Sequence, residues 1–218
     1  MMGRRTITAI AAYVICAACL AAPNIARAER LILAPTGRIV LPSHAAALYL
    51  WRDQGKGQLG RLSLGVPKDD LGLELEVEHF GSVSGNVQTL GAQYSIISEA
   101  FTNNMAPAIS VGVLDLPNRS MFGRSWYLSL SKTLGLSAAQ ERYLGLLRIH
   151  GGYGSHRMGG AYIGASVQIA RRLDVAAELY ARRLNESACL LVAGPLALVG
   201  QSHGGRGWLG AELRFARE

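Results

Sequence analysis

Hydrophobic and polar residues alternate along much of this chain. In residues 71–80, LGLELEVEHF, leucine and valine fill the odd positions up to 77, while Glu74, Glu76 and Glu78 fill even ones. Successive side chains of a β-strand point to opposite faces, so this segment predicts a strand with one aliphatic and one acidic face. The same two-residue period returns in residues 86–97, 159–170 and 207–216. It therefore predicts strands along the whole chain.

Twelve segments have this pattern or a weaker form of it, and short connections rich in turn residues join them. They are residues 44–51, 58–66, 71–80, 86–97, 106–114, 123–133, 142–153, 159–170, 172–182, 186–194, 196–203 and 207–216. Several reach the roughly 9–11 residues that a tilted strand needs to cross a bilayer. Residues 44–51 and 195–203 are poorly patterned, and a helical turn capped by Ser137 is an alternative for 136–145. We therefore predict an all-β fold, an antiparallel up-and-down transmembrane β-barrel of about 10–12 strands.

The composition of the two faces predicts which one points outward. One face is almost purely aliphatic, whereas the other combines glycine, small hydroxyl residues and charges of both signs. A soluble sheet usually carries Lys, Glu and Thr on its outer face. We therefore expect the aliphatic face to contact outer-membrane lipid and the charges to pair inside the lumen. The predicted lumen-facing residues are Glu74, Glu76, Glu78, Arg148, His150, Arg172, Asp174, Glu178, Arg182, Glu212 and Arg214.

The first residues have the features of a secretory signal peptide. Arg4 and Arg5 precede an apolar stretch too short for a spanning helix, and ARA at 26–28 offers small residues for cleavage after Ala28. Cleavage leaves 218 − 28 = 190 residues. An alternative is a lipoprotein acylated at Cys19. The predicted organisation is a signal peptide at 1–28, an N-terminal lead-in segment at 29–43 and the barrel domain at 44–218.

Charge and cysteine content narrow the function classes. The net charge of +7 falls to +4 when Arg4, Arg5 and Arg27 leave with the signal, and no basic run or aromatic–basic motif points to nucleic acid. Cys189 is then the single remaining cysteine, so neither an internal disulfide nor a CxxC site is predicted. The histidines lack metal-binding spacings. We predict no catalytic, cofactor-binding or metal residues.

The enclosed charges favour a porin-like role over catalysis. Acidic and basic columns facing one another would favour passage of small polar solutes or sugars. Two alternatives remain open. His150, Ser155 and His156 lie close in sequence, as in an outer-membrane lipase-type enzyme. A soluble secreted β-sandwich that binds a ligand would also show alternating strands.

Four segments together resemble a known group of proteins. They are APAISVGVLDL (106–116), SWYLSLSKTL (125–134), RIHGGYG (148–154) and DVAAELYARRLN (174–185). The pattern resembles the YjbH-like outer-membrane barrel proteins, and residues 35–48 are similar to an early stretch of that family. This chain lacks the aspartate–glycine that usually follows the glutamate strand; Ala181 and Arg182 stand there. The resemblance implies an outer-membrane location and a part in exopolysaccharide export, and it implies no catalytic residues.

Overall fold

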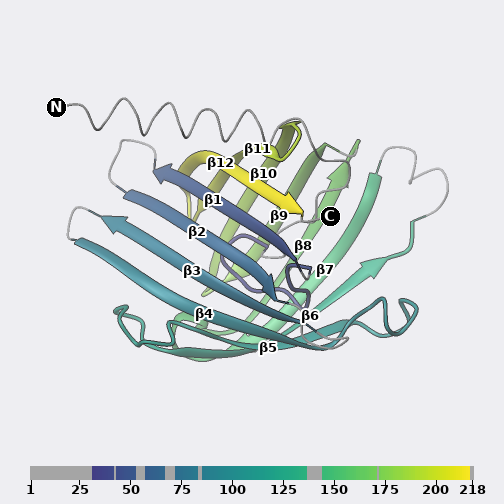
Figure 1. Cartoon of the computed structure of the whole chain (residues 1–218), viewed down its shortest axis with the longest axis horizontal. Helices are drawn as coiled ribbons and strands as arrows, with labels where there is room; N and C mark the ends of the chain where they lie inside the picture. Colours follow the sequence, from purple (N-terminus) through teal and green to yellow (C-terminus); the bar gives the residue numbers. More distant parts are fainter. Residues whose placement is uncertain are drawn as a thin grey trace.

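The computed structural model describes residues 31–41, 43–52, 57–66, 72–82, 85–136, 144–170 and 172–216. These residues form a closed antiparallel barrel of twelve strands (Figure 1). The predicted signal peptide and the alternative helical turn at Ser137 lie outside the described residues. In the part of the chain that is described, no helix has the length and apolar character needed to span a membrane.

Each strand pairs with the next one along the chain, and β1 closes the barrel against β12. The strands are β1 (His44–Arg52), β2 (Gly57–Val66), β3 (Leu73–Ser82), β4 (Gly85–Ile97), β5 (Ala108–Leu114), β6 (Ser125–Leu134), β7 (Leu144–Gly154), β8 (Gly160–Ile169), β9 (Leu173–Tyr180), β10 (Arg183–Ala193), β11 (Leu196–His203) and β12 (Arg206–Ala216). The predicted up-and-down barrel is confirmed, with the strand number at the upper end of the expected range. The two-sheet sandwich is wrong, because one closed sheet holds all twelve strands.

The alternation sorts the side chains to the two faces of the barrel. Leu75 and Val77 on β3 are exposed on the outside, whereas the three glutamates between and beside them are at most 5% exposed. Exposed aliphatic residues continue around the outer face at positions such as Leu128, Ile163 and Leu198. The barrel therefore has an aliphatic outer face and a polar lumen, as predicted.

The longest described connections flank the shortest strand, β5. Residues 98–107 join β4 to β5, and residues 115–124 join β5 to β6. The second connection begins at Asp115, a left-handed residue whose carboxylate accepts hydrogen bonds from the backbone N–H groups of Arg119 and Ser120, 2.8 and 2.7 Å away. The two connections include the first residues of segments that the alternation predicted as strands. The strands predicted at 106–114 and 123–133 therefore begin two residues later than expected.

We call the end of the barrel where His44 pairs with Ala216 the terminal end, and the other the far end. The connection from β7 to β8 lies at the far end and contains a short 3-10 turn, η2 (His156–Met158). Met158 packs in a buried cluster with Leu114, Tyr127, Tyr162 and Tyr180, which come from β5, β6, β8 and β9. This cluster fills that side of the far end with aromatic side chains.

Candidate functional site

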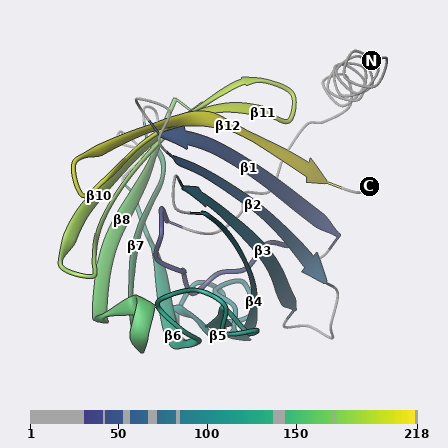
Figure 2. The same ribbon diagram turned by 90° about the vertical axis from the view of Figure 1, so that its left-hand side faces the viewer.

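Residues 31–41 lie inside the barrel, and we call them the plug segment. In Figure 2 this purple segment runs through the space that the strands enclose. Ile32, Ala34, Thr36 and Val40 are at most 2% exposed. The sequence predicted a lead-in segment at 29–43 but gave it no position. Its described part occupies the lumen.

Glu178 on β9 holds the beginning of the plug segment. Its carboxylate accepts hydrogen bonds from the backbone N–H groups of Ile32, Leu33 and Ala34, at 3.1, 3.0 and 3.1 Å. The side-chain amide of Asn185, on β10, donates a fourth at 2.9 Å. Three successive amides that converge on one anion form a nest, the backbone arrangement that binds anions elsewhere in proteins. Here the anion is a carboxylate of the barrel wall that is 1% exposed.

Further along the plug segment, polar side chains of the wall pair with its backbone. The Gln93 amide and the Ser110 hydroxyl both donate to the Thr36 carbonyl, at 2.7 and 3.0 Å. The Val40 N–H donates to Glu74 at 2.9 Å. A chain inside a barrel has little water to satisfy its backbone, so such wall side chains have to supply the partners. The plug segment is therefore held by polar contacts as well as by apolar packing, since Leu31 and Ile32 pack against Ala176 and Ala34 joins the aromatic cluster at the far end.

Gly37 is one point of close approach between the plug segment and the wall. Its N–H donates to the Ser131 hydroxyl at 2.7 Å. A Cβ atom at this position would lie 2.6 Å from the backbone nitrogen of Ser131 and 2.8 Å from the carbonyl carbon of Leu130. Only glycine lets the two backbones approach so closely. A larger residue at position 37 must therefore move away from β6.

A second group of lumen charges is paired within the barrel itself. Arg61 on β2 lies 3.0 Å from Glu78 and 3.5 Å from Glu76. Arg157 reaches in from η2 to the other oxygen of Glu78, at 2.6 Å. These buried pairs cross-link β2, β3 and the β7–β8 connection. Arg61 also reaches the plug segment, because its guanidinium donates to the Ile32 carbonyl at 3.4 Å. On β12, Arg214 pairs with Glu212 at 2.9 Å.

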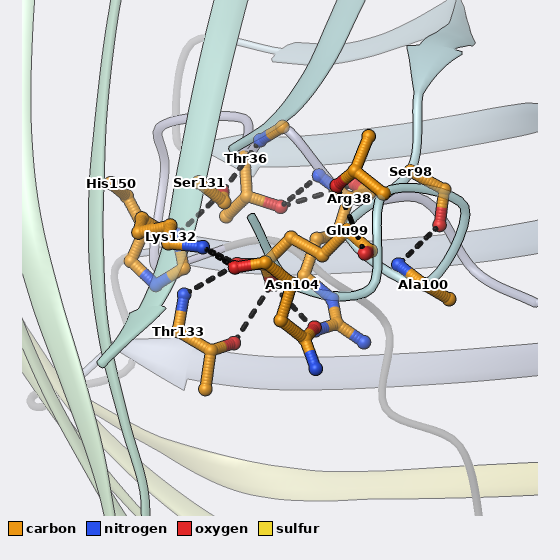
Figure 3. Close-up of polar contacts among 12 residues, drawn as sticks. Thr36, Arg38, Ser98, Glu99, Ala100, Asn104, Ser131, Lys132, Thr133 and His150 are labelled. Atoms are coloured by element: carbon orange, nitrogen blue, oxygen red, sulfur yellow. Dashed lines mark hydrogen bonds and ion pairs between the residues drawn. The ribbon is translucent and has the colours of Figure 1, made fainter. Parts of the chain in front are cut away.

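Glu99 anchors the plug segment at the terminal end (Figure 3). It lies in the β4–β5 connection and accepts hydrogen bonds from the N–H and hydroxyl of Thr133, at 2.7 and 2.8 Å. Arg38 of the plug segment and Lys132 lie 3.4 and 3.7 Å from its oxygens. Burial opposes ionisation of Glu99, but the Thr133 hydrogen bonds and the charges of Arg38 and Lys132 outweigh it. The pKa of Glu99 is therefore lowered from its usual 4.5.

The plug segment does not fill the lumen completely. Between it and strands β1, β2 and β10–β12 lies a cavity of about 50 Å³, lined in part by Ile32, Arg61 and Glu212. This is more than the roughly 10–15 Å³ that one water requires. Ser63 also lines the cavity, and its buried hydroxyl has no hydrogen-bond partner in the described part of the chain. The space next to the plug segment is thus polar and large enough for water.

The structure places most of the residues predicted to face the lumen on the inner face. The buried ones are Glu74, Glu76, Glu78, His150, Asp174, Glu178 and Arg214, and Arg148 and Glu212 are partly buried there. Arg172 and Arg182 differ from the prediction: both are exposed and lie in turns. The alternation continues into these turns, but β9 ends at Tyr180, and Ala181 and Arg182 adopt left-handed φ angles of 48° and 63°. Arg182 is therefore turned out of the sheet.

Sequence reasoning missed the partners that the plug segment uses. Gln93, Ser110, Ser131 and Asn185 are small or neutral polar residues, and such residues also occur on polar faces without binding anything. Arg61 and Arg157 were missed as partners of Glu78 as well. Their positions on the inner side of β2 and in a turn gave no local signal. The excess of carboxylates over arginines on the predicted lumen face was a hint that the carboxylates need further partners.

The residues of the lipase-type alternative do not come together. Ser155 follows His150 by five residues, which on a strand separates them by roughly 17 Å. The His150 ring nitrogens lie instead 2.8 Å from the Ser131 hydroxyl and 3.1 Å from the Ser166 hydroxyl. Ser131 in turn is covered by Gly37 of the plug segment. Among the described residues no group of His, Cys, Asp or Glu is arranged to hold a metal ion.

Comparisons with known proteins support the fold. No family model and no curated protein matches this chain. A solved KdgM porin has a TM-score of 0.52 at 12% identity, over 80% of this chain and 99% of that one. A KdgM porin in complex with disordered oligogalacturonate has a TM-score of 0.51, with the same identity and coverage. At this identity the likeness shows that the chain has a porin-like barrel fold.

Proposed function

We propose that this protein is an outer-membrane channel for small polar solutes, closed in the described state by its own plug segment. One observation carries the proposal: a polar lumen inside an aliphatic exterior is occupied by a separate chain segment, which hydrogen bonds to polar side chains of the wall hold together with apolar packing. Around eight strands already enclose enough side chains to fill a barrel. Twelve strands leave a lumen that here needs a separate segment to close it.

The outer face supports the membrane location. A belt of exposed Leu, Ile and Val around a closed barrel would be a large apolar patch in water, and soluble monomers rarely carry one. In a bilayer the same belt is the required surface, because it faces the hydrocarbon of the lipids. A closed barrel also meets the second requirement of a bilayer, since it pairs the backbone groups of every strand internally. The predicted signal peptide agrees with export to that membrane.

Sugars are one class of small polar solute that the fold neighbour suggests. That KdgM porin was solved in complex with oligogalacturonate. The YjbH-like resemblance implies a part in exopolysaccharide export, and we retain this link as the finer part of the proposal. Neutral and acidic oligosaccharides added to single channels distinguish the sugars that interrupt the current from those that do not.

Two measurements on the full chain test the proposal. Nitroxide labels at Ile163, Val175 and Leu213 should report acyl chains in vesicles, while a label at Ser166 on the inner face should not. In planar bilayers the wild-type chain should conduct little, and Gly37→Val should conduct more because its plug segment cannot fit against β6. Labels that report water at all three outer positions contradict the membrane location. A Gly37→Val chain that releases its plug segment without conducting contradicts the channel.

A further inference from the structure

The charges of the wall indicate which solutes the opened lumen would accept. Among the buried charged residues in the described part of the chain, acidic side chains outnumber arginines by seven to two. The acidic residues are Glu74, Glu76, Glu78, Glu99, Asp115, Asp174 and Glu178, and the arginines are Arg61 and Arg214. A lumen with fixed negative charge attracts cations and repels anions.

Glu178 differs from Glu76, Glu78 and Glu212, which pair with arginines, in how its charge is compensated. Among the described residues no arginine, lysine or histidine forms an ion pair with it, and its four hydrogen bonds come from the plug segment and Asn185. When the plug segment leaves, three of these four donors leave with it. A carboxylate buried without donors is costly, so water or a solute in the opened lumen has to supply donors in their place.

The geometry at Glu178 matches the donors of organic cations. An ammonium group has three N–H donors and a guanidinium has five. The three amides of Ile32, Leu33 and Ala34 occupy the positions that such a group would take, at about 3 Å from the carboxylate oxygens. A carboxylate or phosphate on a solute would instead meet Glu178 with like charge.

We propose that the opened lumen selects cations over anions, and that Glu178 binds the N–H groups of ammonium or guanidinium solutes in place of the plug segment. This inference rests on the proposed channel function and names its solute class. In the closed channel, the backbone amides of the plug segment then occupy the binding site of the solute at Glu178. Polyanionic sugars are excluded, which separates this channel from one that accepts oligogalacturonate.

The test uses the full chain with the plug segment displaced by either of two substitutions. Gly37→Val collides with β6, whereas Ile32→Asp puts a carboxylate into the apolar cluster of Leu31 and Ala176 and leaves the wall residues unchanged. Amide hydrogen exchange at residues 32–34 reports whether the segment has left. The reversal potential across a bilayer in a KCl gradient then gives the ratio of K⁺ to Cl⁻ permeability, and guanidinium chloride on one side tests the organic cation.

We expect both variants to prefer K⁺ by about threefold or more and to carry guanidinium current. Adding Glu178→Gln should bring the ratio close to unity. The matched control is Glu186→Gln, the same change at an exposed position on β10, which should leave the ratio unchanged. If Gly37→Val does not fold, Ile32→Asp gives the same readout.

Each failure has a distinct meaning. Channels that prefer Cl⁻, or whose K⁺ preference survives Glu178→Gln, overturn this inference and leave the channel function standing. Chains that release the plug segment and stay non-conducting overturn the channel function, and this inference with it. Chains that hold the segment despite both substitutions show a permanent plug and overturn both.

Discussion

Glu78 and Glu178 are both carboxylates on the inner wall, and each is 1% exposed. Glu78 receives two arginines, Arg61 and Arg157, at 3.0 and 2.6 Å. Glu178 receives mainly the backbone amides of the plug segment. Glu78 and Glu178 are therefore equally buried but have different partners and different roles. The first carboxylate cross-links β2, β3 and the β7–β8 connection, whereas the second binds a segment that lies outside the twelve strands.

The difference lies in what happens when a partner is lost. We expect removal of an arginine from Glu78 to destabilise the barrel, because both members of each pair belong to the barrel. We expect removal of the amides from Glu178 to change the content of the lumen and to leave the strand pairing intact. The four predictions below separate these two roles, and they run from the largest expected effect to the smallest.

Arg61→Ala should lower the free energy of unfolding by about 3 kcal/mol, because it removes a buried cation from Glu76 and Glu78 and two donors from the Ile32 carbonyl. Urea unfolding in detergent micelles measures this effect. Arg182→Ala, which removes an exposed arginine from a turn, is the matched control and should change stability by less than about 0.5 kcal/mol. Equal losses from the two variants would show that the buried pairs do not hold the wall.

Glu178→Gln should cost less, about 2 kcal/mol, because a neutral amide accepts weaker hydrogen bonds from the three backbone N–H groups. Its main effect should be local. Amide exchange at Ile32, Leu33 and Ala34 should speed up at least about tenfold, since roughly 1.4 kcal/mol corresponds to that factor. Exchange in β3 and β4 should stay as in the wild type. Faster exchange throughout the barrel would mean that Glu178 also cross-links the wall.

Asn185→Ala should have a smaller effect, about 1 kcal/mol. Asn185 donates to Glu178 and accepts from the Gly204 N–H, at 2.9 and 3.0 Å. Three of the four donors to Glu178 remain, so the plug segment should stay protected from exchange. Asn185→Asp keeps the acceptor for Gly204 but sets a second carboxylate beside Glu178, and it should release the segment further. Faster amide exchange of the plug segment in Asn185→Ala than in Asn185→Asp would contradict the donor role of Asn185.

The smallest effect should be the acid dependence at Glu99. Its pKa is lowered in the folded chain, so its contacts stabilise fully above pH 4.5 and lose their contribution as the pH falls through the lowered value. The wild type should exceed Glu99→Gln by about 1 kcal/mol or less near neutral pH. Below pH 4.5 the difference should shrink, as urea unfolding at several pH values would show. A difference that grows on acidification would contradict this sign.

Much of the fold could be predicted from the sequence, because the signals that specify strands and turns lie within short segments of the chain. Alternation in residues such as 71–80 reports the two faces of a strand directly, and turn residues mark most ends. Errors arose where alternation continued into a turn, as at Arg182, or where a carboxylate such as Asp115 organised a longer connection. The family resemblance to YjbH-like proteins remains a prediction.

The sequence by itself determined that strands alternate, that their aliphatic sides share one face and that carboxylates line the other. These follow from the two-residue period of a β-strand, which each segment carries on its own. Only the tertiary structure decided that residues 31–41 enter the lumen and that Glu178, rather than Glu78, holds them. The physical reason is that closure brings strands from distant parts of the chain around one space, and no local pattern records which side chains meet there.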